Sequence, residues 1–141
     1  ERKDRPWKYQ YFADDMLIAS RAQSELRKYS GQFDLTTLCD GLVYLSAYAQ
    51  YRRKELSEDI LYMYAERCHW EIQGCGKEAL KMHREDYTVT MNGHPYILDQ
   101  HIKHGVHADE LIRIYFCWDD DLGKIIIGSM PGHLATVKNS T

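Results

Sequence analysis

Several side chains that can carry charge or move a proton lie close together in the second half of the chain. His101, Lys103, His104 and His107 fall within seven residues. A lysine ammonium neutralises a phosphate, and a histidine transfers a proton near neutral pH. If residues 98–103 continue as a strand, His101 and Lys103 share a face, because strand side chains alternate with a period of two. The alternative is a solvated loop with scattered histidines.

Two further candidates follow along the chain. Arg113 alternates with Ile112 and Ile114, which places it on the opposite face of a strand from these isoleucines. Its guanidinium can clamp a phosphate or a carboxylate, although a solvated arginine on the outer face of a sheet is the alternative. The segment 129–134 follows an isoleucine-rich strand directly and carries His133 in a loop of the kind that often carries function, and a structural histidine is the alternative there.

These side chains together suit in-line attack of a ribose 2′-hydroxyl on the adjacent phosphodiester. That reaction needs a base, an acid and cations on the phosphate, and it needs no metal. We therefore expect no cofactor and predict a catalytic set made of His101, Lys103, His104, Arg113 and His133. A metal site on the three closely spaced histidines is the alternative, but no HExxH pattern accompanies them.

Composition excludes several classes of protein. There are 18 Lys and Arg against 21 Asp and Glu, so we do not expect a positive potential over the whole surface that would attract nucleic acid. A local basic patch is compatible with this balance. No stretch approaches 18 apolar residues and the charged N-terminus has no apolar core, so we expect no membrane partner and a cytoplasmic location. The four cysteines lack CxxC spacing and are expected to be reduced thiols. The chain begins without Met, as a piece of a longer protein would.

The length of 141 residues fits one domain of the α+β class, with a helical half (1–68) followed by a β half (69–141). Residues 1–12 are expected to be a flexible extension. Helical periodicity predicts helices near 13–29, 35–54 and 57–68. A stripe of tyrosines on the second helix suits either the core or a partner interface, and it comprises Tyr44, Tyr48 and Tyr51.

Turn signals divide the β half. Asn92-Gly93 is a strong hairpin signal because both positions of its turn need positive φ, and 119–123 is expected to be the turn of a second hairpin. Three consecutive isoleucines (125–127) indicate a strand that is buried on both faces, or on one face with a helix covering it. The predicted architecture is two or three N-terminal helices packed on a C-terminal antiparallel sheet of about four strands. The predicted core comprises Leu38, Leu42, Leu45, Ile60, Ile114, Phe116, Ile125 and Ile127.

The segment 111–134, LIRIYFCWDDDLGKIIIGSMPGHL, resembles the final hairpin of RelE/ParE/HigB-type toxins. The shared pattern is an Arg-initiated apolar strand, an acidic turn, an isoleucine strand and a tail ending in Gly-His. Residues 87–136, about a third of the chain, also resemble the C-terminal part of uncharacterised bacterial proteins from defence and mobile-element contexts.

The resemblance implies cleavage of free or ribosome-bound RNA in a toxin–antitoxin or phage-defence system, with an antitoxin as partner. By position Arg113 matches the strand arginine, His133 the C-terminal catalytic position, and Lys103 loosely the preceding basic residues. The chain departs from these toxins in being acidic and in showing no leading strand before its helices. ParE-type members are not ribonucleases, so a shared fold does not fix the chemistry.

Two functions therefore stay open. One is a toxin-like, metal-independent endoribonuclease, and the other is a non-enzymatic interaction domain of a larger bacterial defence or mobile-element protein. Antiparallel strands return the tail to the end of the sheet where Arg113 begins. We therefore predict that Lys103, Arg113 and His133 line one concave surface, with His101 or His104 beside them.

Overall fold

The computed structural model describes residues 13–29, 33–104 and 111–134, so the expected extension at 1–12 lies outside the described residues. The elements in chain order are β1 (Met16–Ile18), α2 (Ser20–Lys28), α3 (Leu35–Arg52), α4 (Glu58–Cys68), β2 (Glu71–Gly74), α5 (Lys77–Met82), β3 (Thr88–Met91), β4 (His94–Ile97), β5 (Gln100–His104), β6 (Ile112–Asp119) and β7 (Lys124–Ser129).

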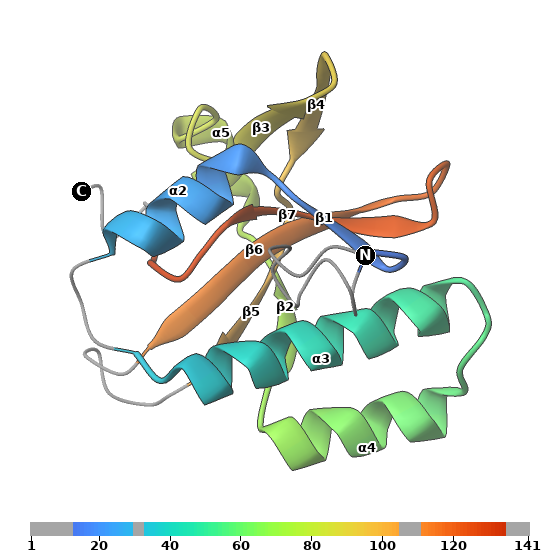
Figure 1. Ribbon diagram of the computed structural model, residues 1–141. Helices are drawn as coiled ribbons and strands as arrows, with labels where there is room; N and C mark the ends of the chain where they lie inside the picture. Colours follow the sequence, from blue (N-terminus) through green and yellow to red (C-terminus); the bar gives the residue numbers. More distant parts are fainter. Residues whose placement is uncertain (1–12, 30–32, 105–110, 135–141) are drawn as a thin grey trace, which may run out of the picture.

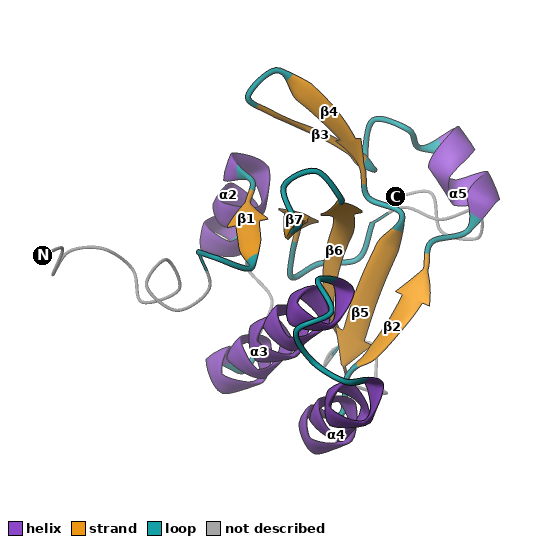
Figure 2. Cartoon of the chain, turned by 90° about the vertical axis from the view of Figure 1, so that its right-hand side faces the viewer, coloured by secondary structure: helices purple, strands orange, loops and turns teal. Residues whose placement is uncertain are grey.

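A five-stranded sheet organises the molecule, with the strand order β1-β7-β6-β5-β2, and β3 and β4 pair separately. The hairpin of α3 and α4 lies on one side of this sheet, while α5 and the β3–β4 hairpin lie on the other (Figures 1 and 2). The α+β class is confirmed. The expected antiparallel sheet of about four strands is wrong in its strand count and in one pair, because β1 runs parallel to β7.

The largest difference from the sequence prediction is at β1, where a helix was expected from residue 13. Met16 pairs with Ile125 and Ile18 with Ile127, and both β1 side chains are buried in the α3 side of the core. The parallel pairing with the isoleucine strand therefore overrides the local helical spacing. The sequence argument that no strand precedes the helices was wrong for the same reason.

The next two helices match their predicted positions because their start signals are local. The Asp34 carboxylate caps α3 by accepting from the Thr36 N–H at 3.1 Å, and the Ser57 hydroxyl caps α4 by accepting from the Ile60 N–H at 3.3 Å. Helix α5 was not predicted, since six residues are too few to establish a helical period.

Both predicted hairpins are present. Asn92 and Gly93 have φ of 53° and 78°, as their turn requires. In the second turn the Asp119 carboxylate accepts from the N–H groups of Asp121 and Leu122 at 2.9 and 3.0 Å. The acidic run therefore forms the expected hairpin turn.

The sheet separates two apolar clusters. The larger, under α3 and α4, contains seven of the eight predicted core residues, and the other lies under β3 and α5. The isoleucines 125–127 are each 0% exposed and reach both clusters, which confirms burial on both faces. Ile60 was wrongly placed in the core and is 40% exposed. Helix α4 contacts the core through a stripe at helical spacing that excludes Ile60 and consists of Leu61, Tyr64, Ala65 and Cys68.

Most of the tyrosine stripe of α3 belongs to the core. Tyr44 is buried, and the ring of Tyr48 meets Phe116 edge-on with centroids 6.0 Å apart. On the other face, a Cβ added to Gly128 would lie 2.5 Å from Leu98 Cδ2, so only glycine lets the Leu98 side chain approach β7 this closely.

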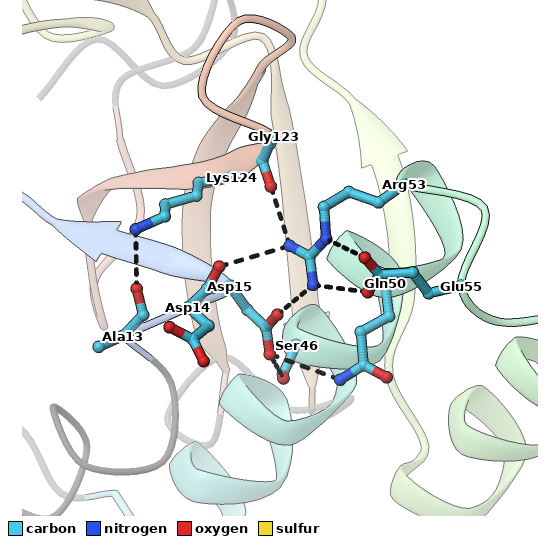
Figure 3. Close-up of polar contacts among 9 residues, drawn as sticks. All are labelled: Ala13, Asp14, Asp15, Ser46, Gln50, Arg53, Glu55, Gly123 and Lys124. Carbon is cyan, nitrogen blue, oxygen red and sulfur yellow. Dashed lines mark hydrogen bonds and ion pairs between the residues drawn. The ribbon is translucent and has the colours of Figure 1, made fainter.

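A buried carboxylate joins three distant segments (Figure 3). Asp15, just before β1, accepts from the Ser46 hydroxyl of α3 and from Arg53 Nη2 at 2.6 Å. Arg53 also donates to the Gly123 carbonyl in the β6–β7 turn at 2.9 Å. The cluster thus fixes β1 against the end of α3 and against the β6–β7 hairpin.

Candidate functional site

A cavity of about 450 Å³ lies on the α5 side of the sheet. It brings together four of the five side chains that the sequence singled out, namely His101, Lys103, Arg113 and His133. The remaining lining comes from the segment before and into α5 and from two tyrosines, with Gln73, Cys75, Gly76, Lys77, Glu78, Ala79, Tyr87 and Tyr115 as its members. The placement of the four is a geometric result, and their catalytic roles stay predictions.

Strand pairing positions the two cations. Lys103 of β5 lies directly opposite Arg113 of β6, and His101 lies opposite Tyr115 two residues along. Because strand side chains alternate, the four members of these two cross-strand pairs project to one face of the sheet. Ile102 and Ile114 project to the other face and are fully buried under α3. Two adjacent cross-strand pairs therefore form the floor of the cavity.

The loop after β7 brings His133 to the same floor. The Pro131 carbonyl accepts from the Arg113 N–H at 3.0 Å, and the Tyr115 hydroxyl accepts from the Leu134 N–H at 3.2 Å. These two hydrogen bonds attach the loop to β6 on both sides of His133. Tyr115 is therefore a positioning residue for this histidine.

Aromatic and sulfur contacts hold the His101 imidazole. Its ring centroid lies 5.2 Å from that of Tyr115, and its Nδ1 lies 3.6 Å from the Cys75 Sγ. Tyr87 packs edge-on against Tyr115 with centroids 5.8 Å apart. Tyr115 could have been found from the sequence, because it shares a strand face with Arg113. No sequence signal pointed to Tyr87 or Cys75, which come from segments outside the β5–β6–β7 run.

The cavity disfavours positive charge on its histidines. Burial, followed by the positive charges of Arg113 and Lys103, lowers the pKa of His101 to about 4. His133 is exposed at the rim of the cavity, where partial desolvation, followed by the positive charge of Arg113, lowers its pKa. Burial raises the pKa of the Cys75 thiol to about 12, so this sulfur stays protonated at neutral pH.

Neither cation at the floor forms an ion pair with a described carboxylate, although Glu71 of β2 lies opposite Lys103 in the sheet and Glu78 lines the same cavity. The ion pairs found among the described residues involve Arg21 and Arg53, and none of them includes Lys103 or Arg113. Two unpaired cations that face each other across neighbouring strands repel, and an anion bound between them would relieve that repulsion. The arrangement is therefore suited to bind a phosphate or carboxylate, with uncharged histidines beside it.

His104 does not join this group. It is the next residue after Lys103 on β5 and projects to the opposite face, where its ring centroid lies 5.2 Å from that of Trp70. The alternative histidine metal site used His107, which lies outside the described residues. Among the residues that are described, no group of three His, Cys, Asp or Glu side chains is placed to hold a metal ion. The four cysteines are free.

Fold and cavity together define an α+β protein with a cationic, histidine-lined cavity. Scans of known protein families, of curated proteins and of solved structures gave no match to this chain. The resemblance to RelE/ParE/HigB-type toxins stays a prediction. Over the described part of the chain, no helix is both long and apolar enough to cross a membrane.

Proposed function

We propose that the chain is a toxin-like, metal-independent endoribonuclease of a bacterial toxin–antitoxin or phage-defence system. The observation that carries the proposal is the convergence of two unpaired cations with two uncharged histidines in one cavity. A phosphodiester supplies the negative charge that Arg113 and Lys103 lack, and its cleavage needs the proton transfers that imidazole performs.

The roles follow from exposure and charge. The ribose 2′-oxygen attacks phosphorus, and its proton passes to the neutral imidazole of His133, which is exposed at the rim of the cavity. The bond from phosphorus to the 5′-oxygen breaks, and that oxygen takes a proton from the Lys103 ammonium. Arg113 holds the non-bridging oxygens of the transition state. The products are a 2′,3′-cyclic phosphate and a 5′-hydroxyl.

His101 has a different role in this scheme. A pKa of about 4 makes it a weak base at neutral pH. Held by Tyr115 and Cys75, its neutral ring is oriented to donate one hydrogen bond to the phosphate without adding a further positive charge to the floor. His104 is left out of the scheme because it projects away from the cavity.

The experiment is cleavage of a labelled RNA by the purified chain in the presence of EDTA, alone and in a translation extract. We expect products with cyclic phosphate ends and a loss of at least about 100-fold in Arg113→Gln and His133→Ala. Arg67→Gln and His104→Gln are the matched controls, because both side chains lie away from the cavity, and they should cleave normally. Absence of RNA cleavage by the wild type in both settings would overturn the proposal.

One observation favours the interaction-domain alternative. The outer face of α4 exposes three large apolar side chains, with Tyr62 at 66%, Met63 at 58% and Ile60 at 40%. Exposed apolar groups of this kind are typical of protein-binding surfaces. If the chain acts by binding a protein, Met63→Ser should abolish its effect in cells while Arg113→Gln leaves it intact. The endoribonuclease proposal predicts the reverse.

A further inference from the structure

A second cavity, of about 470 Å³, adjoins the first at the loop that carries His133. One wall is formed by residues 129–134, and the other by one side of α2, from Arg21 to Lys28, together with Tyr29. His133 lines both cavities, so it lies between them. A linear ligand that places its reacting group at His133 can therefore extend into both.

The two cavities concentrate positive charge on an acidic protein. Their linings contain five Lys and Arg side chains and two Glu, a surplus of three positive charges in a chain whose net charge is −3. One of those carboxylates, Glu25, is already occupied. It accepts from the Ser129 hydroxyl at 2.7 Å and from the Met130 N–H at 3.2 Å, and it pairs with Arg21 at 3.0 Å.

Lys28 is the cation of the second cavity that stays available. It is exposed at the end of α2, and no ion pair within the described stretches includes it. Its flexible side chain can follow a phosphate from the rim, whereas Arg21 is held by Glu25 and by the Thr88 carbonyl at 3.4 Å. The second cavity therefore offers one mobile positive charge.

Tyr29 gives this cavity an aromatic surface. It is 37% exposed, and its Cε1 lies 3.9 Å from where a Cβ on Gly132 would be, so the ring borders the loop one residue before His133. Phe33 supports the ring, with centroids 5.7 Å apart and planes inclined at 57°. Gly132 has no side chain to cover the ring. Aromatic rings beside a cationic groove are how proteins bind the bases of single-stranded nucleic acids.

We propose that this second cavity binds a nucleotide next to the scissile phosphate, with its base stacked on Tyr29 and its outer phosphate near Lys28. The inference rests on the proposed function, and it specifies the substrate as single-stranded RNA, because a base within a duplex has no free face to stack on Tyr29. Two consecutive nucleotides then occupy the two cavities, with the phosphate between them at Arg113 and His133.

The test is binding of a fluorescein-labelled strand of ten 2′-O-methyl ribonucleotides, which cannot be cleaved because its 2′-oxygens are blocked. We expect Tyr29→Ala to weaken binding by about 5- to 100-fold, the usual effect of losing one base stack. Tyr29→Phe keeps the ring and should bind like the wild type. Tyr62→Ala removes a tyrosine from the outer face of α4 and is the matched control.

Salt dependence tests the lysine separately. Lys28→Ala should reduce the slope of log affinity against log salt concentration by about 0.7, the value for one contact to a single-strand phosphate. Lys81→Ala, on α5 outside both cavities, should leave the slope unchanged. A duplex of the same sequence should compete poorly.

The outcomes separate the two proposals. If Tyr29→Ala binds as tightly as the wild type, or if the duplex binds equally well, the second nucleotide site is refuted while RNA cleavage can still stand. If binding depends on Tyr29 but the wild type cleaves no RNA, the endoribonuclease proposal fails and the single-strand site remains. Absence of any binding by the wild type refutes the second site directly.

Discussion

Acidification should destabilise the protein through His101. Its pKa is about 4 in the folded chain, against an ordinary value of 6.5. The unfolded chain therefore takes up this proton at a higher pH than the folded chain does. The stabilisation from neutral His101 is complete above about pH 6.5 and is lost as the pH falls towards 4.

The size of the effect follows from that difference. Between pH 7.5 and pH 5 a pKa lowered from 6.5 to about 4 changes the free energy of unfolding by about 2 kcal/mol. The cavity opens to solvent and His101 is only partly buried, so screening reduces the expected loss to about 1–2 kcal/mol.

Urea unfolding of the wild type and of His101→Gln at both pH values measures this contribution. The carboxylates titrate alike in the two proteins, so the difference between the two losses isolates His101. The wild type should lose about 1–2 kcal/mol more than the variant on acidification. Equal losses would show that the folded chain does not resist protonation of His101, and the description of the cavity as one that keeps this histidine neutral would be wrong.

Three further outcomes are expected. Ile114→Ala should lower the free energy of unfolding by about 2–4 kcal/mol and Ile60→Ala by less than about 1 kcal/mol, because only Ile114 is buried. Similar losses in the two variants would contradict the assignment of Ile114 to the core and of Ile60 to the surface. Arg53→Gln should cost about 2–4 kcal/mol in chemical denaturation by leaving the buried Asp15 carboxylate without its cation, and adding Asp15→Asn should restore part of that loss. The kcat/KM for RNA cleavage should fall as the pH drops through the pKa of His133, which partial desolvation and Arg113 keep below 6.5; a flat profile from pH 7 to pH 4 would exclude this base.

Local chemistry alone determined a large part of this structure. Helical periodicity predicted α3 and α4, whose starts are set by the local caps Asp34 and Ser57. Asn92-Gly93 predicted a hairpin, because its turn depends on dihedral angles within a few residues. Strand alternation likewise placed Arg113 on the face opposite Ile114, since a period of two needs no knowledge of the partner strand.

The same local patterns predicted part of the candidate site. Alternation and hairpin topology predicted one surface for Lys103, Arg113 and His133, and the cavity contains all three. The sequence left His101 and His104 both open because it did not establish that this segment is a strand. Once Gln100–His104 forms β5, alternation places His101 beside Lys103 and His104 on the opposite face.

Other features were decided only by contacts between residues far apart in the chain. Met16–Ile18 forms a strand because β7 offers it a partner more than 100 residues away, and nothing within the segment signals that pairing. Tyr87 and Cys75 reach the cavity because their segments pack against β6 and β5. The second cavity depends on α2 meeting the loop after β7, where Glu25 binds Ser129. The sequence alone thus determined which residues share a face, because that depends on local backbone geometry, and the tertiary structure decided which faces meet, because that depends on the free energy of long-range packing.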